Sequence, residues 1–71
     1  MAQKFFVGDV VEYIGPRNWS KRHIISDADY CGAGRFEYAT DRGAWFTDAE
    51  FKLIRRADKE SFAELDKRHQ P

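Results

Sequence analysis

The sequence lacks most of the features that define a protein's class by themselves. It has a single cysteine, Cys31, so an internal disulfide is excluded and we expect a protein of the reducing cytoplasm. No apolar run approaches the roughly 20 residues that cross a bilayer. Lys4 is followed by only three apolar residues before Gly8, too few for a signal peptide. We therefore predict a cytoplasmic protein with no membrane partner.

An excess of charge of either sign is also missing. Twelve lysines and arginines balance twelve aspartates and glutamates over 71 residues. Domains that bind nucleic acid mainly by bulk charge are strongly basic, so this balance argues against that class while leaving room for a local basic patch. A chain of this length forms one domain and has no room for a second core.

Patterns for catalysis and for metal binding are missing as well. Cys31 and His23 are the only thiol and imidazole that could pair, and no neighbouring group in the sequence activates the thiol. Together with Asp27 and Asp29 they match no zinc or calcium spacing. Residues 32–34 are too short for a phosphate-binding loop and precede a strand. We predict a protein that is not an enzyme, with no catalytic residue, no metal and no cofactor.

Aromatic residues, in contrast, are abundant: two Trp, three Tyr and six Phe, each able to bury roughly 150–250 Å². They fall in short segments of alternating pattern. In the first, Val11 and Tyr13 should face one side and Val10 and Ile14 the other, so we expect both sides to be covered. The predicted strands are residues 9–14, 22–26, 35–40, 44–46 and 51–54, with loops at 15–21 and 27–34.

Turn and helix signals separate these strands and follow the last one. Residues 41–43, Asp-Arg-Gly, predict a tight hairpin. Residues 47–50 predict a single 3₁₀ turn that Thr47 opens as the N-cap of a capping box. After residue 56 the pattern predicts a helix that Asp58 can cap, with a second possible start at Ser61-Phe62-Ala63-Glu64. Because isolated helices of about 12 residues are marginal in water, this helix should dock, fray or fold against a partner.

Residues 5–54 resemble the broad group of SH3-like barrels, which includes the KOW, Tudor and bacterial SH3-like types. The matching segments are the Val7-Gly8-Asp9-x-Val11 opening, the Phe36-x-Tyr38 strand, the Asp41-Arg42-Gly43 hairpin and the closing segment from Trp45-Phe46 to Leu53. The resemblance implies a mainly β protein, with a single SH3-like five-stranded β-barrel at 1–56 and a short C-terminal α-helix within 57–71. Members of the group bind peptides, RNA, DNA or other proteins. The core that it implies is Val11, Tyr13, Ile25, Phe36, Tyr38, Phe46, Phe51 and Leu53. The Ala-Leu-Tyr-x-Tyr pattern of peptide-binding SH3 domains is absent, so we do not expect a proline-rich ligand.

The loop from Arg17 to His23 is the first candidate site. Arg17, Lys21 and Arg22 surround Trp19 without an acidic residue among them. Aromatic and basic residues on one loop suit the stacking of a base and the binding of a phosphate. Trp is also highly buried on average, so Trp19 alone is better interpreted as a cover for one end of the core. Four further arginines could extend the patch if they lie on the same side: Arg35, Arg42, Arg55 and Arg56.

Trp45 is the second candidate, because its neighbour in the strand faces the core and strand side chains alternate. Two interpretations compete. In the favoured one, Phe62 and Leu65 of the helix pack on Trp45 as a lid. In the other, Trp45 joins Tyr30 or Trp19 in an aromatic hot spot for a protein partner, since hot spots are enriched in Trp, Tyr and Arg.

The sequence as a whole predicts a non-enzymatic binding module that docks on a larger protein partner as a regulator or inhibitor. A whole protein consisting of one small module suits a phage or another mobile element. The alternative is a nucleic-acid-binding barrel that uses the loop from Arg17 to His23. Small barrels often pair through edge strands, so the protein is predicted to be a monomer or a homodimer. The predicted binding residues are Arg17, Trp19, Lys21, Arg22, Tyr30, Arg42 and Trp45.

Overall fold

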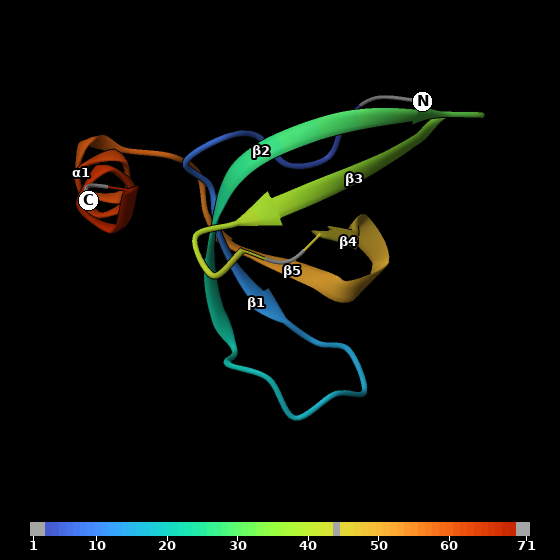
Figure 1. Ribbon diagram of the computed structural model, residues 1–71, viewed down its shortest axis with the longest axis horizontal. Coiled ribbons are helices and arrows are strands. Elements are labelled where there is room, and N and C mark those ends of the chain that lie inside the picture. Colours follow the sequence, from blue (N-terminus) through green and yellow to red (C-terminus); the bar gives the residue numbers. More distant parts are fainter. Residues whose placement is uncertain (1–2, 44, 70–71) are drawn as a thin grey trace.

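The computed structural model describes residues 3–43 and 45–69, with side chains through residue 67. Ala44, which we assigned to the fourth strand, and residues 1–2 and 70–71 lie outside the described residues. The described chain forms five strands, a 3₁₀ turn and a C-terminal helix (Figure 1). In chain order these are β1 (Val10–Tyr13), β2 (Arg22–Gly32), β3 (Arg35–Thr40), β4 (Trp45–Thr47), η1 (Asp48–Glu50), β5 (Phe51–Arg55) and α1 (Lys59–His69).

The strands pair antiparallel in the order β4-β3-β2-β1-β5. The long strand β2 pairs with β1 near its start and with β3 over the rest, and its register shifts between Ile25 and Asp27. The prediction of a mainly β protein with five strands and a short C-terminal helix is confirmed. Within the described ranges no ladder joins β4 to β5. Closure into a barrel and the resemblance to SH3-like proteins therefore stay predictions.

The main core contains every residue that the sequence analysis assigned to it. Six of the eight are buried and two, Phe36 and Leu53, pack against the margin. Phe5 is a core residue that the sequence analysis missed, because it precedes the first strand. Its ring meets those of Tyr38 and Phe51 edge-on, at centroid distances of 5.3 Å and 6.1 Å. Its backbone N–H donates to the Tyr38 hydroxyl (3.3 Å), which fixes the segment before β1 to β3.

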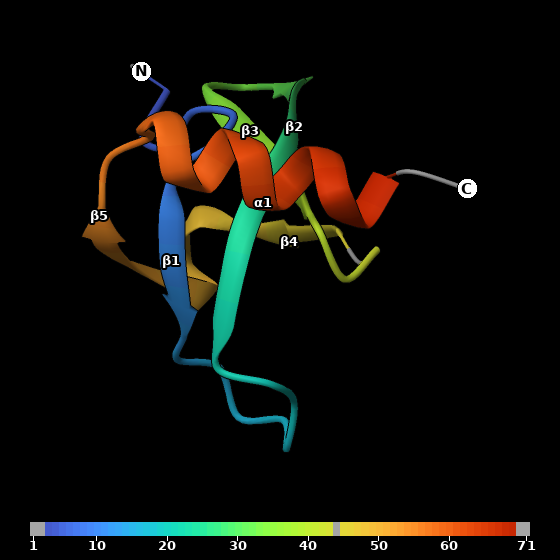
Figure 2. The same cartoon turned by 90° about the vertical axis from the view of Figure 1, so that its left-hand side faces the viewer.

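The other side of β1 and β2 is covered by α1. Leu65 of the helix is buried together with Val10 and Ile24, and Figure 2 shows the helix lying across β1 and β2. The guanidinium of Arg22 binds both carboxylate oxygens of Glu64, at 2.9 Å and 3.2 Å. The prediction that both sides of the first strand are covered is confirmed for Val10 and Val11.

No helix in the described part of the chain is both long and apolar enough to cross a membrane.

The two predicted N-caps, Asp58 and Thr47, have different outcomes. Asp58 caps α1, because its Oδ1 accepts the backbone N–H of Ser61 (2.7 Å) and the Ser61 hydroxyl oxygen accepts the N–H of Asp58 (2.9 Å). The hydrogen bond from the Ser61 backbone lowers the pKa of Asp58. Thr47 does precede a 3₁₀ turn as predicted, but its side chain makes no capping hydrogen bond. That capping box was wrong.

The predicted loop at 27–34 was also wrong, since β2 continues through most of it. The turn is limited to Ala33 and Gly34, which both have positive φ (53° and 74°). Asp27 points to solvent, and its carboxylate accepts the N–H of Ala28 (2.8 Å) where the register shifts. Aspartates that disfavour a strand in isolation are tolerated here because β3 supplies the pairing partner.

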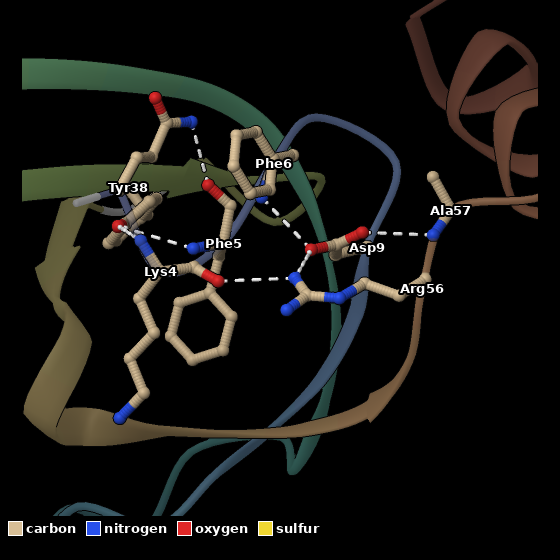
Figure 3. A network of polar contacts seen from close by, with 8 residues as sticks. Lys4, Phe5, Phe6, Asp9, Tyr38, Arg56 and Ala57 are labelled. Atoms are coloured by element: carbon tan, nitrogen blue, oxygen red, sulfur yellow. Dashed lines mark hydrogen bonds and ion pairs between the residues drawn. The ribbon is translucent and has the colours of Figure 1, made fainter.

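A buried carboxylate joins the start of the sheet to the segment before the helix (Figure 3). Asp9 is 1% exposed. Its Oδ2 accepts hydrogen bonds from the N–H of Phe6 (2.9 Å) and from Nη1 of Arg56 (2.8 Å), and its Oδ1 accepts the N–H of Ala57 (2.9 Å). Nη1 of Arg56 also donates to the carbonyl of Lys4 (3.1 Å). Asp9 thereby satisfies two backbone groups that belong to neither a strand nor a helix.

Candidate functional site

The loop between β1 and β2 lies at the end of the molecule away from α1 in both views (Figures 1 and 2). Its tryptophan, Trp19, packs on the core and also faces solvent. The ring centroid is 4.9 Å from that of Phe46 and 5.4 Å from that of Tyr13, yet 43% of the residue is exposed. Trp19 therefore covers one end of the core, as predicted, and still presents aromatic surface.

A small pocket of about 240 Å³ opens beside this ring, which we call the Trp19 pocket. Its lining residues come from the loop, from β2, from the turn after β3 and from β4: Trp19, Ser20, His23, Arg42 and Phe46. Arg17 is not a lining residue, but it brings a cation to one wall of the pocket, because its guanidinium carbon lies 4.9 Å from the centroid of the Trp19 ring. Such cation–π contacts orient a guanidinium over an aromatic face. The site therefore combines aromatic walls with two arginines.

His23 links the loop to β3 within this pocket, because its two ring nitrogens bind Ser20 and Thr40. Its Nε2 is 2.7 Å from the carbonyl oxygen of Ser20, and since a carbonyl can only accept, Nε2 carries a proton. In the neutral ring, Nδ1 then accepts from the hydroxyl of Thr40 (2.9 Å), whose oxygen accepts the backbone N–H of Arg42 (3.2 Å). The sequence analysis considered His23 only as a catalytic or metal-binding residue. Its place two residues before the core residue Ile25 was the signal that it faces inward.

Arg22 does not belong to the Trp19 pocket, although it lies on the same loop-to-strand segment as Trp19. It neighbours His23, which faces the core, and its guanidinium binds Glu64 of α1 on the other side of the sheet. The hydrogen bonds that Arg22 donates to the Glu64 carboxylate raise the pKa of Arg22. Lys21 is exposed, and its carbonyl accepts the N–H of Tyr13 (2.6 Å). The predicted cluster of Arg17, Lys21 and Arg22 is thus divided between two sides of the sheet.

The other arginines do not extend the patch as a group. Arg42 joins the pocket, while Arg35 and Arg56 line a separate hollow of about 800 Å³ at the N-terminal segment. Arg56 binds Asp9, and Nε of Arg55 lies 3.4 Å from the Asp58 carboxylate. The basic surface predicted around Trp19 is therefore reduced to Arg17 and Arg42.

Tyr30 and Trp45 are both exposed, at separate places in the sheet. Tyr30 lies near the end of β2 and stacks on Phe36 of β3, with a centroid distance of 5.1 Å. Trp45 is 49% exposed and alternates with the buried Phe46 on β4. Among the described residues no ring contact joins Trp45 to Tyr30 or to Trp19. The structure does not bring the three predicted aromatics into one cluster.

The helix residues that we expected on Trp45 are engaged elsewhere. Leu65 is buried with Val10 and Ile24. The ring of Phe62 lies against Gly8, where an added Cβ would be 2.8 Å from it. The helix therefore covers the middle of the sheet, which differs from the lid that we expected over Trp45.

Cys31 and His23 lie toward opposite ends of β2. Cys31 is exposed, and partial desolvation together with the nearby Glu37 raises the pKa of its thiol. His23 is buried and both of its ring nitrogens have partners. The two side chains therefore form no nucleophile–base pair. Among the side chains that the structure describes, in residues 3–43 and 45–67, no group of three or more His, Cys, Asp or Glu is placed to hold a metal ion.

Comparisons of the chain with protein-family models, with curated proteins and with solved structures give no match. The Trp19 pocket is accordingly interpreted from its own geometry.

Proposed function

We propose that this protein is a small non-enzymatic module that docks on a larger protein and regulates or inhibits it. The docking surface in this proposal is the Trp19 pocket together with Arg17. The observation that carries the proposal is an exposed tryptophan that is anchored in the core and flanked by two arginines. Tryptophan and arginine are the residues that most often dominate the free energy of protein–protein binding.

The rigidity of the pocket supports the same function. Trp19 is held by two core aromatics, and His23 binds both the loop and the strand that carries Thr40. Side chains that are already ordered lose little conformational entropy when a partner binds, and each flexible side chain that must be ordered costs about 0.5–1.5 kcal/mol. A surface that is ordered in this way suits stable docking.

The pairing of the other arginines favours a protein partner over nucleic acid. Arg22, Arg55 and Arg56 each lie beside a carboxylate of the same chain, and the net charge is zero. Binding to nucleic acid draws most of its affinity from several cations along the phosphate backbone. Nucleic-acid binding through the loop from Arg17 to His23 remains the alternative, and the experiment below distinguishes the two.

Two tryptophan variants test the proposal. Trp19→Ala removes the anchor, and Trp45→Ala is a matched control because it removes the same kind of side chain, exposed to a similar degree (49% against 43%). The immobilised protein is used to capture partners from a lysate of its host, after both variants are shown to fold by circular dichroism. We expect a protein that is retained by wild type and by Trp45→Ala and is lost with Trp19→Ala.

The competing function has its own readout in the same proteins. Short single-stranded RNA and DNA are titrated at low and at high salt while tryptophan fluorescence is followed. Salt-sensitive quenching that disappears in Trp19→Ala would replace docking on a protein by binding to nucleic acid. A partner lost equally with both tryptophan variants would also contradict the proposal, because the binding surface would then not be the Trp19 pocket.

A further inference from the structure

The arginines of this protein fall into two groups. Those of the first group each lie beside a carboxylate of the same chain, at N–O distances of 2.9 Å, 3.4 Å and 2.8 Å for Arg22, Arg55 and Arg56. Arg17 and Arg42 differ, since neither forms an ion pair with the described part of the chain. The guanidinium of Arg17 lies on the Trp19 ring, and Nε of Arg42 donates to a backbone carbonyl (3.1 Å). Both are at the Trp19 pocket.

The pocket itself has aromatic walls and carries no carboxylate. His23 is one of its lining residues, and its two ring nitrogens already bind Ser20 and Thr40. An anionic ligand group therefore finds no free imidazole nitrogen and would be met by the arginines. The terminal nitrogens of Arg42 and the guanidinium of Arg17 are available, and a guanidinium fits a carboxylate in a bidentate manner.

The size of the pocket limits what can enter it. At about 240 Å³ it is smaller than the roughly 300–1,000 Å³ of sites that enclose a small-molecule ligand. It suits a single apolar side chain that belongs to a larger partner. The neighbours of that side chain on the partner would then lie over the rim, next to Arg17 and Arg42.

We infer that the Trp19 pocket binds an acidic segment of a partner protein, with one aromatic or aliphatic side chain in the pocket and flanking carboxylates on Arg17 and Arg42. This inference rests on the proposed docking function and adds the chemistry of the segment that is recognised. Charge complementarity carries it: Arg17 lies on the Trp19 ring, Arg42 lines the pocket, and neither has an ion-pair partner among the described residues. No carboxylate is among the residues that line the pocket. Two cations match two flanking carboxylates, whereas binding along a phosphate backbone requires a longer row of cations.

Synthetic peptides test the inference directly. A short fluorescein-labelled peptide with a central phenylalanine between aspartates and glutamates is the probe, and binding is followed by fluorescence anisotropy. Three control peptides replace the acids by asparagine and glutamine, replace the acids by lysine, or replace the phenylalanine by alanine. We expect the acidic phenylalanine peptide to bind at least about tenfold more tightly than each control, as the loss of one charge-assisted contact or one buried side chain predicts.

Variants of the protein locate the binding. Arg17→Gln and Arg42→Gln should each weaken the acidic peptide about tenfold. Arg35→Gln is the matched control, because Arg35 is exposed and lines the separate hollow, and it should leave the affinity unchanged. Both pocket arginines are exposed side chains, and thermal unfolding of each variant shows that a loss of affinity is not a loss of folding.

The possible failures of the two proposals are distinguishable. The inference about acidic segments would be overturned if the asparagine–glutamine peptide bound as tightly as the acidic peptide. It would also be overturned if neither Arg17→Gln nor Arg42→Gln reduced the affinity for the acidic peptide. If no peptide binds while Trp19→Ala still loses the captured protein, the acidic segment is wrong and docking stands. If an oligonucleotide binds at Trp19 in place of any peptide, or if neither peptides nor captured proteins depend on Trp19, both proposals fall.

Discussion

Removal of the Asp9 carboxylate should be among the most damaging single changes that this protein can undergo. Asp9 accepts three hydrogen bonds in a site that is 1% exposed. In Asp9→Ala the backbone N–H groups of Phe6 and Ala57 lose their partner, and a buried group left unpaired costs about 1–3 kcal/mol. The lost bond to Arg56 adds less, because that side chain is 58% exposed and can be solvated. We expect a loss of about 3 kcal/mol, against a total of roughly 4–10 kcal/mol for a chain of this size.

Urea unfolding followed by tryptophan fluorescence measures the free energy of unfolding by linear extrapolation. Arg56→Gln is the informative companion, because it removes the ion pair and leaves both backbone N–H groups bound to Asp9. Arg56 is 58% exposed but the Asp9 carboxylate is only 2% exposed, so the cost should exceed the roughly 0–1 kcal/mol of a surface pair. It should still be smaller than the loss in Asp9→Ala, because both backbone N–H groups keep their acceptor. The stability loss of Asp9→Asn should lie between those of the other two variants. The amide oxygen can still accept a hydrogen bond, but the amide NH₂ is a donor and would face a group that donates to Asp9 in the wild type. A loss below about 1 kcal/mol in Asp9→Ala, or an equal loss in Arg56→Gln, would refute the assignment of the stability to the backbone groups.

Two further comparisons each isolate one contribution to stability: the close packing around Gly8, and the charge of the Asp58 carboxylate. Gly8→Ala and Gly43→Ala both place a side chain at positive φ (93° and 89°), but only at Gly8 would the new Cβ lie 2.8 Å from the Phe62 ring and from the Cβ of Ala57. Gly8→Ala should therefore destabilise by about 1–3 kcal/mol more, and equal losses in urea would contradict these close contacts. The Ser61 backbone N–H lowers the pKa of Asp58, so the carboxylate stabilises above its unfolded pKa of about 3.9 and ceases to do so as pH falls through the lower folded value. The stability difference between wild type and Asp58→Asn should shrink below about pH 4, and a difference that is independent of pH would contradict this origin.

The sequence predicted the core well because inward and outward alternation is a local property. Phe36 and Tyr38 in β3, and Val11 and Tyr13 in β1, face the core as the period of two requires. The length of β2 could not be predicted in this way. Its second half is a strand because it pairs with β3. The glycines and aspartates of that segment give no sign of this pairing, because they favour a loop when considered alone.

The role of Asp9 also could not be predicted from the residues next to it in the sequence. Its partners Arg56 and Ala57 come 47 and 48 positions later in the chain. A glycine–aspartate pair before a strand predicts a turn, which is also present, since the N–H of Asp9 donates to the carbonyl of Phe6 (2.9 Å). Nothing in the sequence indicates that the same carboxylate is buried against a segment after the last strand.

Half of the candidate site was visible in the sequence. Arg17 and Trp19 are two positions apart on one loop and remain together in the structure. Arg42 joins them only because the turn after β3 meets the loop, and Arg22 leaves them because Glu64, 42 positions later, binds it on the other side of the sheet. The sequence therefore predicts which residue types form the site, while the fold decides which arginines take part.

The division of the arginines should have little effect on folding and, in the proposed docking, a larger effect on binding. An ion pair at an exposed position contributes at most about 1 kcal/mol, so leaving Arg17 and Arg42 without a carboxylate scarcely lowers the stability of the fold. At the rim of an apolar pocket, a carboxylate brought by a partner would be partly removed from water, where a charge-assisted hydrogen bond is roughly twice as strong as a neutral one. In the proposed docking, these two side chains, whose lack of an ion pair costs the folded chain little, would therefore dominate the choice of partner. Arg22, already bound to Glu64, would first have to give up that contact.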